Sequence, residues 1–172
     1  MLKNYIWKTL NFVFTATICL ILIRSLLIEP GKINGISMEP TFLDENIFLV
    51  EKFSLLFSSP KRGQIVQIYL PSLNEIMVKR IIGLPGEQIT IKQNGVFITD
   101  VDQQTWKLPE VYLADGVATK SRLLTTETYP KLKRAEYFVL GDNRRESTDS
   151  RNYGPVHRSQ IFGQAIQLPF LK

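Results

Sequence analysis

The stretch Gly35-Ile36-Ser37-Met38-Glu39-Pro40-Thr41 (the serine stretch, residues 35–41) follows an apolar N-terminal segment. Gly35 allows a close approach of the backbone and Pro40 excludes a continuing helix, so Ser37 is predicted to lie on a constrained loop. A serine hydroxyl becomes a good nucleophile only when a base takes its proton. Pro40 stands where a Ser-x-x-Lys motif would place its lysine, so any base must come from elsewhere in the chain. Taken alone, a serine in such a loop is most often a turn residue.

The stretch Val78-Lys79-Arg80-Ile81-Ile82-Gly83-Leu84-Pro85-Gly86 (the lysine stretch, residues 78–86) offers a candidate base. Residues 76–82 are typical of a strand, on which Lys79 shares its face with the apolar side chains of Met77 and Ile81. Burial disfavours an ammonium ion, so the pKa of Lys79 is expected to fall from about 10.4 to roughly 7–8, where a lysine can act as a general base. The alternative is an amphipathic strand on which Lys79 is exposed and Arg80 pairs with an acid.

The stretch Gly141-Asp142-Asn143-Arg144-Arg145-Glu146-Ser147-Thr148-Asp149-Ser150-Arg151 (the Gly-Asp stretch, residues 141–151) follows a predicted core strand at residues 137–140. Its carboxylates could suggest a metal site, but the nearby arginines make internal ion pairing the favoured interpretation. The carboxylates are Asp142, Glu146 and Asp149, and the arginines are Arg144, Arg145, Arg151 and Arg158. With one cysteine (Cys19) and one histidine (His157), Cys/His metal-ligand spacing is absent and a Ser-His-Asp triad would depend on a single residue. No metal or organic cofactor is expected.

The N-terminal segment is predicted to be an uncleaved membrane anchor. Residues 9–23 carry no charge, and residues 5–28 approach the roughly 20 residues needed to cross the apolar core of a bilayer. Lys3 and Lys8 precede the apolar run and Glu29 follows it, so the N-terminus is expected in the cytoplasm and the rest of the chain outside. A cleavable signal peptide is disfavoured because no small-x-small cleavage site follows the run. A buried amphipathic helix is the other alternative.

Composition favours a domain of strands and turns. The 172 residues fit one compact domain with small additions, and nine prolines and ten glycines are scattered between short apolar runs. Residues 88–92 and 96–99 form a predicted hairpin around Asn94-Gly95. Residues 100–134 are polar and irregular and are interpreted as a small insertion without a catalytic signature. The net charge of +5 is spread over separate basic pairs interleaved with acids, so no nucleic-acid partner is expected.

The apolar run Phe-Ser-Leu-Leu-Phe at residues 53–57 has two interpretations. We favour a place in the hydrophobic core of the domain. The alternative is a loop that dips into the surface of the bilayer, as exposed apolar groups close to a membrane can do.

The three stretches, in this order and behind an anchor, resemble the type I signal peptidases, which are membrane-bound Ser/Lys proteases. The run Lys-Arg-Ile-Ile-Gly-Leu-Pro-Gly-Glu from residue 79 is similar to the family's lysine box, and the Gly-Asp stretch with the following Asn-Tyr-Gly-Pro-Val is similar to its final box. The resemblance implies a coiled antiparallel β-sheet fold with one N-terminal transmembrane helix and a small β insertion. It also implies four segments: a cytoplasmic tip and anchor (1–28), two parts of a catalytic core (29–99 and 135–172), and the insertion (100–134).

The resemblance further implies the roles of the site residues. Ser37 would be the nucleophile and Lys79 the general base, and Ser147 would hydrogen-bond to Lys79 and orient it. In part of the family a serine at the position of Gly35 helps to form the oxyanion hole, so here the backbone N–H of Ser37 is the expected donor. The implied supporting residues are Asp142, Asp149 and Arg151, of which the last two would form a salt bridge.

The implied function is removal of signal peptides from exported preproteins at the outer face of the cytoplasmic membrane. Preproteins and the lipid bilayer are the expected partners, a monomer is the expected oligomeric state, and shallow apolar pockets would select small residues before the cut. The mitochondrial inner-membrane peptidases are close relatives, and the sequence alone distinguishes them poorly from the bacterial enzymes. Soluble, self-cleaving repressor-type Ser/Lys proteases are disfavoured by the anchor. A catalytically inactive, membrane-anchored β interaction protein is the remaining alternative, and the intact Ser37, Lys79 and Ser147 argue against it.

Overall fold

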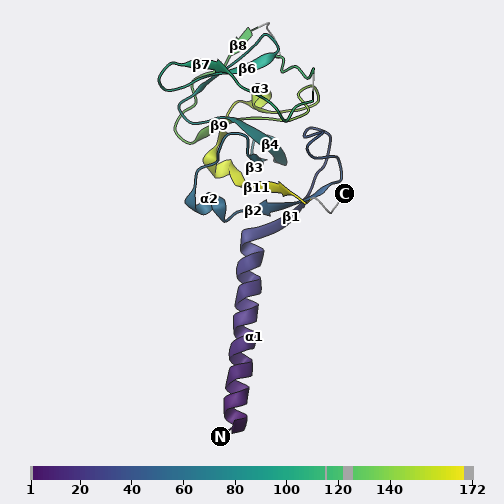
Figure 1. Ribbon diagram of the computed structural model, residues 1–172, viewed down its shortest axis with the longest axis vertical. Helices are drawn as coiled ribbons and strands as arrows, with labels where there is room; N and C mark the ends of the chain where they lie inside the picture. The colour runs from purple at the N-terminus through teal and green to yellow at the C-terminus, as the bar shows by residue number, and fades with distance from the viewer. Residues whose placement is uncertain (1, 115, 122–125, 169–172) are drawn as a thin grey trace.

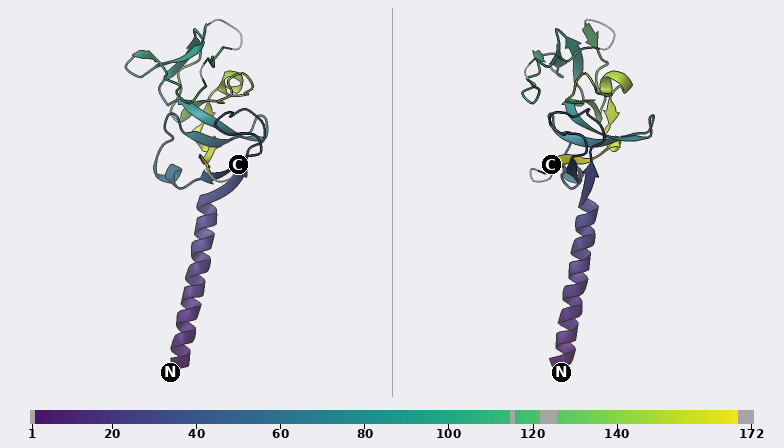
Figure 2. Two further views of the ribbon diagram at one scale, coloured as in Figure 1. Left: turned by 45° about the vertical axis from the view of Figure 1, so that its right-hand side comes forward. Right: turned by 90° about the vertical axis from the view of Figure 1, so that its right-hand side faces the viewer.

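A long N-terminal helix projects from a domain built mainly of β-strands (Figure 1). The computed structural model describes residues 2–114, 116–121 and 126–168. Helix α1 (Leu2–Leu27) leads directly into the first strand and stands clear of the domain in both turned views (Figure 2). This arrangement confirms the predicted mainly β fold with one N-terminal apolar helix.

Helix α1 has the length and composition of a membrane span. Among the described residues it is the one helix that meets both criteria: Asn4–Leu22 has a mean hydropathy of 1.5, and none of it is buried inside the structure. The hydroxyls of Thr9, Thr15 and Thr17 donate to carbonyl groups four residues earlier, which satisfies them without water. Lys3 is one of the two lysines from which the orientation of this segment in the membrane was predicted, and its side chain lies outside the described part of the structure.

The strands form two antiparallel sheets, with seven strands in the order β1-β2-β11-β3-β4-β9-β10 and four in the order β7-β6-β5-β8. The larger contains β1 (Ile28–Lys32), β2 (Ile47–Glu51), β3 (Ile65–Leu70), β4 (Glu75–Gly83), β9 (Glu136–Leu140), β10 (Val156–His157) and β11 (Ile161–Gln167). The smaller contains β5 (Gln88–Lys92), β6 (Gly95–Thr99), β7 (Thr105–Lys107) and β8 (Thr126–Thr128). Short helices are α2 (Ser54–Phe57), α3 (Ser150–Tyr153) and the 3-10 turn η1 (Arg158–Gln160). The smaller sheet lies at the end of the domain far from α1 (Figure 1).

Strands β4 and β9 contribute to two clusters of buried side chains. Ile81 and Val139 belong to the first cluster, whereas Ile82 and Phe138 belong to the second. Because neighbouring residues on a strand point to opposite faces, both faces of this strand pair are covered. A third cluster packs the loop after β1 against β2 and β11, and its buried members are Ile33, Met38, Phe42, Phe48, Val50 and Ala165. Strand β4 is therefore a firmly packed support for the residues along it.

The predicted hairpin is confirmed, with its turn one residue earlier than expected. Lys92 pairs directly with Gly95, so the two-residue loop is Gln93-Asn94. Both loop residues have positive φ, at 49° and 59°. Two positive φ values in a two-residue loop match the twist of the flanking strands. Gly95 lies instead in β6, where the side chain of Lys107 leaves little space for a Cβ.

The insertion completes the smaller sheet. Strand β7 pairs with β6 and β8 pairs with β5, so strands from residues 100–134 extend the hairpin β5–β6. The pairing crosses the predicted boundary between residues 99 and 100. Residue 115 and residues 122–125 of the insertion lie outside the described part. The division of the chain into four segments stays a prediction.

The favoured interpretation of residues 53–57 as core is wrong for all but one of their apolar side chains. Leu55 is 6% exposed, whereas Phe53, Leu56 and Phe57 are 51%, 67% and 78% exposed. The physical reason is that α2 is a single helical turn, so only one of its sides can face the domain. The exposed side chains lie close to the end of α1, because the backbone N–H of the preceding Lys52 donates to the carbonyl of Leu27 at 2.9 Å.

The contact of β11 with β2 yields a stability prediction. A Cβ on Gly163 would lie 2.5 Å from Val50 Cγ1 and 2.7 Å from the carbonyl oxygen of Glu51. Gly163→Ala is therefore expected to lower the free energy of unfolding by about 1–3 kcal/mol, measured by urea unfolding of the full chain in detergent. The control is Gly95→Ala, whose Cβ would meet only the flexible end of Lys107 and should cost less. Equal losses in the two variants would contradict the packing argument.

Candidate active site

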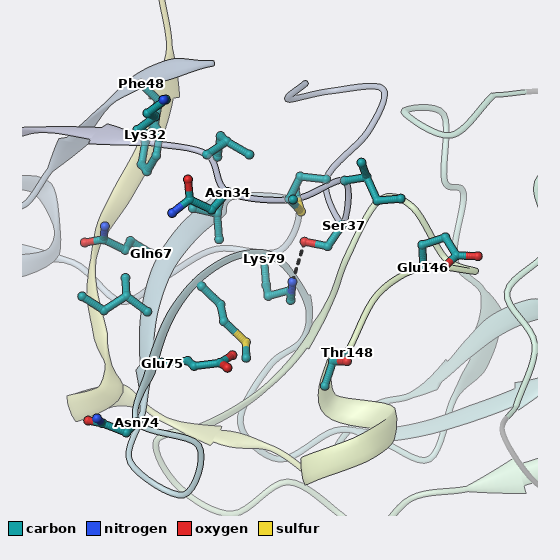
Figure 3. A pocket seen from close by; sticks show the side chains of 17 residues that line it. Lys32, Asn34, Ser37, Phe48, Gln67, Asn74, Glu75, Lys79, Glu146 and Thr148 are labelled. Carbon is teal, nitrogen blue, oxygen red and sulfur yellow. Dashed lines mark hydrogen bonds between the residues drawn. The ribbon is translucent and has the colours of Figure 1, made fainter. Parts of the chain in front are cut away.

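Ser37 and Lys79, 42 residues apart in the sequence, are brought into contact. Lys79 Nζ donates a hydrogen bond of 2.8 Å to Ser37 Oγ (Figure 3). Lys79 lies within β4, where it pairs in register with Val66 of β3. Ser37 lies on the loop that follows β1, as its glycine and proline neighbours predict.

Polar contacts hold the Ser37 loop on two sides. The backbone N–H of Gly35 donates to Asp44 Oδ1 at 2.7 Å. The carbonyl of Ser37 accepts from the backbone N–H of Asn143 at 3.0 Å, and the Asn143 side chain donates to the carbonyl of Ile36 at 3.2 Å. The loop is therefore bonded directly to the Gly-Asp stretch, which fixes Ser37 relative to the end of β9.

Burial determines the charge state of Lys79. The residue is 3% exposed, and its removal from water lowers the pKa of its ammonium group to about 8. The carboxylates of Asp149, Glu75 and Asp142 act in the opposite direction, and the charge of Arg151 adds to the lowering. A lysine with this pKa is neutral in a substantial fraction of molecules near neutral pH, as a general base must be.

The neighbouring Arg80 forms a buried ion pair that joins all three stretches. Its Nε and Nη2 atoms donate to the two carboxylate oxygens of Asp142 at 2.8 and 2.6 Å. Asp142 also accepts from Thr41 Oγ1 at 2.5 Å, and Arg80 Nη1 donates to the carbonyl of Gly63 at 2.8 Å. This pairing places Asp142 beside the lysine stretch and the serine stretch at once.

A second ion pair stabilises the far end of the Gly-Asp stretch. Arg151 donates to both carboxylate oxygens of Asp149 at 2.8 Å. The fully buried Asp149 also caps α3 by accepting from the backbone N–H of Arg151, and it accepts from the backbone N–H of Gly141 at 3.1 Å. One carboxylate thus holds both ends of the loop that carries Ser147.

Ser147 packs beside the Ser37 loop, but its hydroxyl is unpaired. The Oγ atom is buried and has no hydrogen-bond partner among the described residues, so the expected bond to Lys79 is not among the contacts found. A Cβ on Gly141 would lie 2.1 Å from Ser147 Oγ and 2.5 Å from the carbonyl oxygen of Ser37. Only glycine therefore fits between these two groups, and the orienting role of Ser147 stays a prediction.

The backbone at Gly35 leaves space next to Ser37. Gly35 has a φ of +94°, and no atom lies within 4 Å of the position that its Cβ would occupy. No hydrogen bond from the backbone N–H of Ser37 occurs within the described part of the chain. This N–H is therefore available as a donor to an oxyanion, as expected for a site without a serine at position 35.

Ser37 and Lys79 line a cavity of about 950 Å³. Glu146 and Thr148 lie on one side of the pair, and Asn34 and Gln67 lie on the other (Figure 3). The remaining lining residues are Lys32, Ile33, Gly35, Ile36, Met38, Phe48, Asn74, Glu75, Ile76, Met77 and Val78. Polar and apolar side chains both line the cavity, so it can hold a peptide backbone together with small apolar side chains.

Some cavity residues were missed by sequence analysis. Glu75 could have been found, because it lies four residues before Lys79 on β4 and so shares its face. Asn34, Gln67 and Thr148 carry no local signal, since they reach the cavity only through the packing of separate segments.

Other catalytic arrangements have no support among the described residues. No group of three or more His, Cys, Asp or Glu side chains in this part of the chain could hold a metal ion. The only histidine, His157, is exposed and contacts Ser159 at 2.9 Å, and it does not line the cavity of Ser37.

Comparisons with known proteins agree with the resemblance. A family model described as "Signal peptidase, peptidase S26" matches residues 6–170. The chain is 40% identical over 175 residues to a signal peptidase I of Bacillus amyloliquefaciens, with 98% of this chain and 91% of the relative covered. It is 37% identical over 135 residues to signal peptidase I V of Bacillus subtilis (strain 168), with 77% and 80% covered.

A solved structure shows the same similarity in three dimensions. The crystal structure of a signal peptidase I from Enterococcus faecalis V583 superimposes with a TM-score of 0.51 at 30% sequence identity. The match covers 62% of this chain and 97% of that one. Because the family model spans nearly the whole chain and the relatives match over most of their length, this chain belongs to the signal peptidase I family of S26 serine peptidases.

Proposed function

We propose that this protein is a membrane-anchored endopeptidase that removes signal peptides from exported preproteins, with Ser37 as nucleophile and Lys79 as general base. The observation that carries the proposal is the 2.8 Å contact of Lys79 Nζ with Ser37 Oγ, made by a buried lysine. Membership of the family supports a peptidase that acts on signal peptides. The inactive interaction protein is disfavoured, because burying a lysine against a serine costs desolvation that such a protein would not need.

The contact is suited to acyl transfer. Neutral Lys79 accepts the proton of the Ser37 hydroxyl while Oγ attacks the scissile carbonyl carbon, and the backbone N–H of Ser37 donates to the developing oxyanion. The intermediate collapses to an ester on Ser37, and Lys79 gives its proton to the leaving amine. Water then loses a proton to Lys79 and attacks the ester, and that proton returns to Ser37 Oγ as the cleaved peptide leaves. Ser147 is the proposed residue that orients Lys79 during these steps.

A peptide substrate can bind as an added strand. Strand β3 pairs with β4 from Glu75 to Arg80, whereas β9 pairs with β4 only from Arg80 onward. The edge of β4 at residues 75–78 therefore has no partner strand among the described residues, and these residues line the cavity. An extended peptide that bonds to this edge would pass between β4 and the Ser37 loop, with its scissile carbonyl near Oγ.

The proposed membrane arrangement is based on α1. With α1 across the bilayer and Lys8 on its cytoplasmic side, the catalytic domain lies on the outer face, where exported preproteins emerge. The exposed side chains of Phe53, which precedes α2, and of Leu56 and Phe57 in α2 lie next to the end of α1, so we propose that they contact the outer leaflet.

Loss of either member of the pair should abolish cleavage. Ser37→Ala and Lys79→Ala are each expected to lower kcat by at least about a thousandfold in a preprotein cleavage assay in detergent, because nucleophile and base act as a unit. Control variants Ser159→Ala and Lys131→Ala remove an exposed serine and an exposed lysine and should keep full activity. A folded Lys79→Ala variant with near-normal activity would exclude Lys79 as the base.

The pKa of Lys79 predicts the pH dependence. Only the neutral amine accepts a proton, so kcat/KM should rise with pH up to about 8 and fall about tenfold for each unit below it. The charge of Glu75 raises this pKa, so Glu75→Gln should lower it and extend activity to lower pH. Asp102→Asn, in the exposed turn between β6 and β7, is the control and should leave the profile unchanged. An unchanged pH profile of kcat/KM in Glu75→Gln would contradict the assignment of Lys79 as the titrating base.

The proposed contact of α2 with lipid can be tested by fluorescence. A tryptophan at position 57 (Phe57→Trp), in a background without Trp7 and Trp106, should be quenched by brominated phospholipids in vesicles. A tryptophan at position 111 (Val111→Trp), where the native side chain is 93% exposed in the insertion, should not be quenched. Similar quenching at both positions would refute a specific contact of α2 with the bilayer.

A further inference from the structure

One aromatic side chain of the insertion reaches the charged network behind the site. Tyr112 is partly buried and contacts two arginines: Arg80 Cζ lies 4.0 Å from the centroid of its ring, and Arg144 Cζ lies 5.8 Å from it. Arg80 belongs to the lysine stretch, and Arg144 belongs to the Gly-Asp stretch. A residue from a segment without a catalytic signature thus lies where two of the three stretches meet.

The Arg80 guanidinium connects the strand of Lys79 to the loop of Ser37. Arg80 follows Lys79 directly on β4, and its two bonds to Asp142 connect it to Thr41, four residues after Ser37. Movement of this guanidinium away from Asp142 would release that connection. A guanidinium over an aromatic face is held by the ring quadrupole, and the attraction is stronger when both groups are removed from water.

Arg144 ties the other side of Tyr112 to the Gly-Asp stretch. Its side chain is fully buried, its Nη2 pairs with Glu110 Oε1 at 2.5 Å, and its Nε donates to the carbonyl of Gly141 at 3.0 Å. The same guanidinium donates to Thr119 Oγ1 and, at 3.1 Å, to the hydroxyl of Tyr112. The insertion therefore supplies the counter-ion that allows a second arginine to be buried close to Arg80.

The hydroxyl of Tyr112 adds two hydrogen bonds to a ring that already packs against Arg80 and Arg144. It accepts from Arg144 and donates to Glu110 Oε1 at 3.1 Å. Burial raises the pKa of Tyr112 above its usual range, so the hydroxyl keeps its proton at any pH at which the enzyme would work. With its edge bonded in this way, the ring presents one face to Arg80.

We propose that Tyr112 is a positioning residue for the reaction, because its ring holds the Arg80 guanidinium against Asp142 and so keeps Ser37 and Lys79 in contact. This role rests on the proposed function, in which these two residues carry the chemistry. The other two aromatic side chains of the insertion contact different groups, and Arg62 Cζ lies 6.0 Å from the centroid of the Trp106 ring. Tyr129 packs on the ring of Phe138 at 4.7 Å within the second core cluster and touches neither arginine.

Four variants of the full chain in detergent, assayed on a preprotein, separate positioning from packing. Tyr112→Leu removes the ring face and should lower kcat about tenfold with KM changed less than about twofold, because the lost contact holds the reacting groups. Tyr112→Phe keeps the ring and should retain kcat within about twofold. Tyr129→Leu is the matched control from the same insertion and should lower the thermal midpoint without lowering kcat. Ser37→Ala measures the cleavage that remains without the proposed nucleophile.

The outcomes distinguish the role of Tyr112 from the proposed function. Equal kcat values for folded Tyr112→Leu and Tyr129→Leu would overturn the positioning role. A loss of kcat in Tyr112→Phe as large as in Tyr112→Leu would also overturn it, because the hydroxyl and not the ring would then carry the effect. If Tyr112→Leu does not fold, Tyr112→Met replaces it with the same expected loss. A wild-type chain no more active than Ser37→Ala would overturn the proposed function itself, and the positioning role with it.

Discussion

The buried ion pair of Arg80 with Asp142 is the constraint on which the site depends. It joins residues 62 positions apart and connects the lysine stretch, the Gly-Asp stretch and, through Thr41, the serine stretch. Loss of one partner would leave an unpaired buried charge, which costs several kcal/mol, so the two must be buried together or not at all. The pair therefore favours the one arrangement in which Ser37 and Lys79 are also in contact.

As the proposed base, Lys79 would take the part that a histidine has in a Ser-His-Asp triad. Burial lowers the pKa of its ammonium group, while the carboxylates of Asp149, Glu75 and Asp142 limit the fall to about 8. The balance depends on the two ion pairs, because Asp142 and Asp149 face arginines of their own. The same pairs that shape the site therefore also adjust the proton affinity of Lys79.

The insertion and the end of α1 add two contacts that the motifs do not contain. Tyr112 and Glu110 bring the insertion against Arg80 and Arg144, so a segment that completes the smaller sheet also borders the site. At the opposite end, the hydrogen bond from the backbone N–H of Lys52 to the carbonyl of Leu27 holds α2 next to the end of α1. The catalytic domain is thus attached to α1 by backbone pairing through β1 and β2 rather than by a free linker.

Local patterns in the sequence were sufficient for the apolar N-terminal helix, most strands, the hairpin and the candidates Ser37 and Lys79, because side-chain periodicity and turn chemistry act over a few residues. They failed for residues 53–57, where an apolar run cannot show that only Leu55 has a partner in the core. The pairing of Arg80 with Asp142, of Arg144 with Glu110 and of Lys79 with Ser37 was decided by the tertiary structure alone. These contacts join residues tens of positions apart. They depend on the strand register, on the bulge between β4 and β9 and on the space left by Gly141. The residues next to each contact in the sequence do not determine any of these three features.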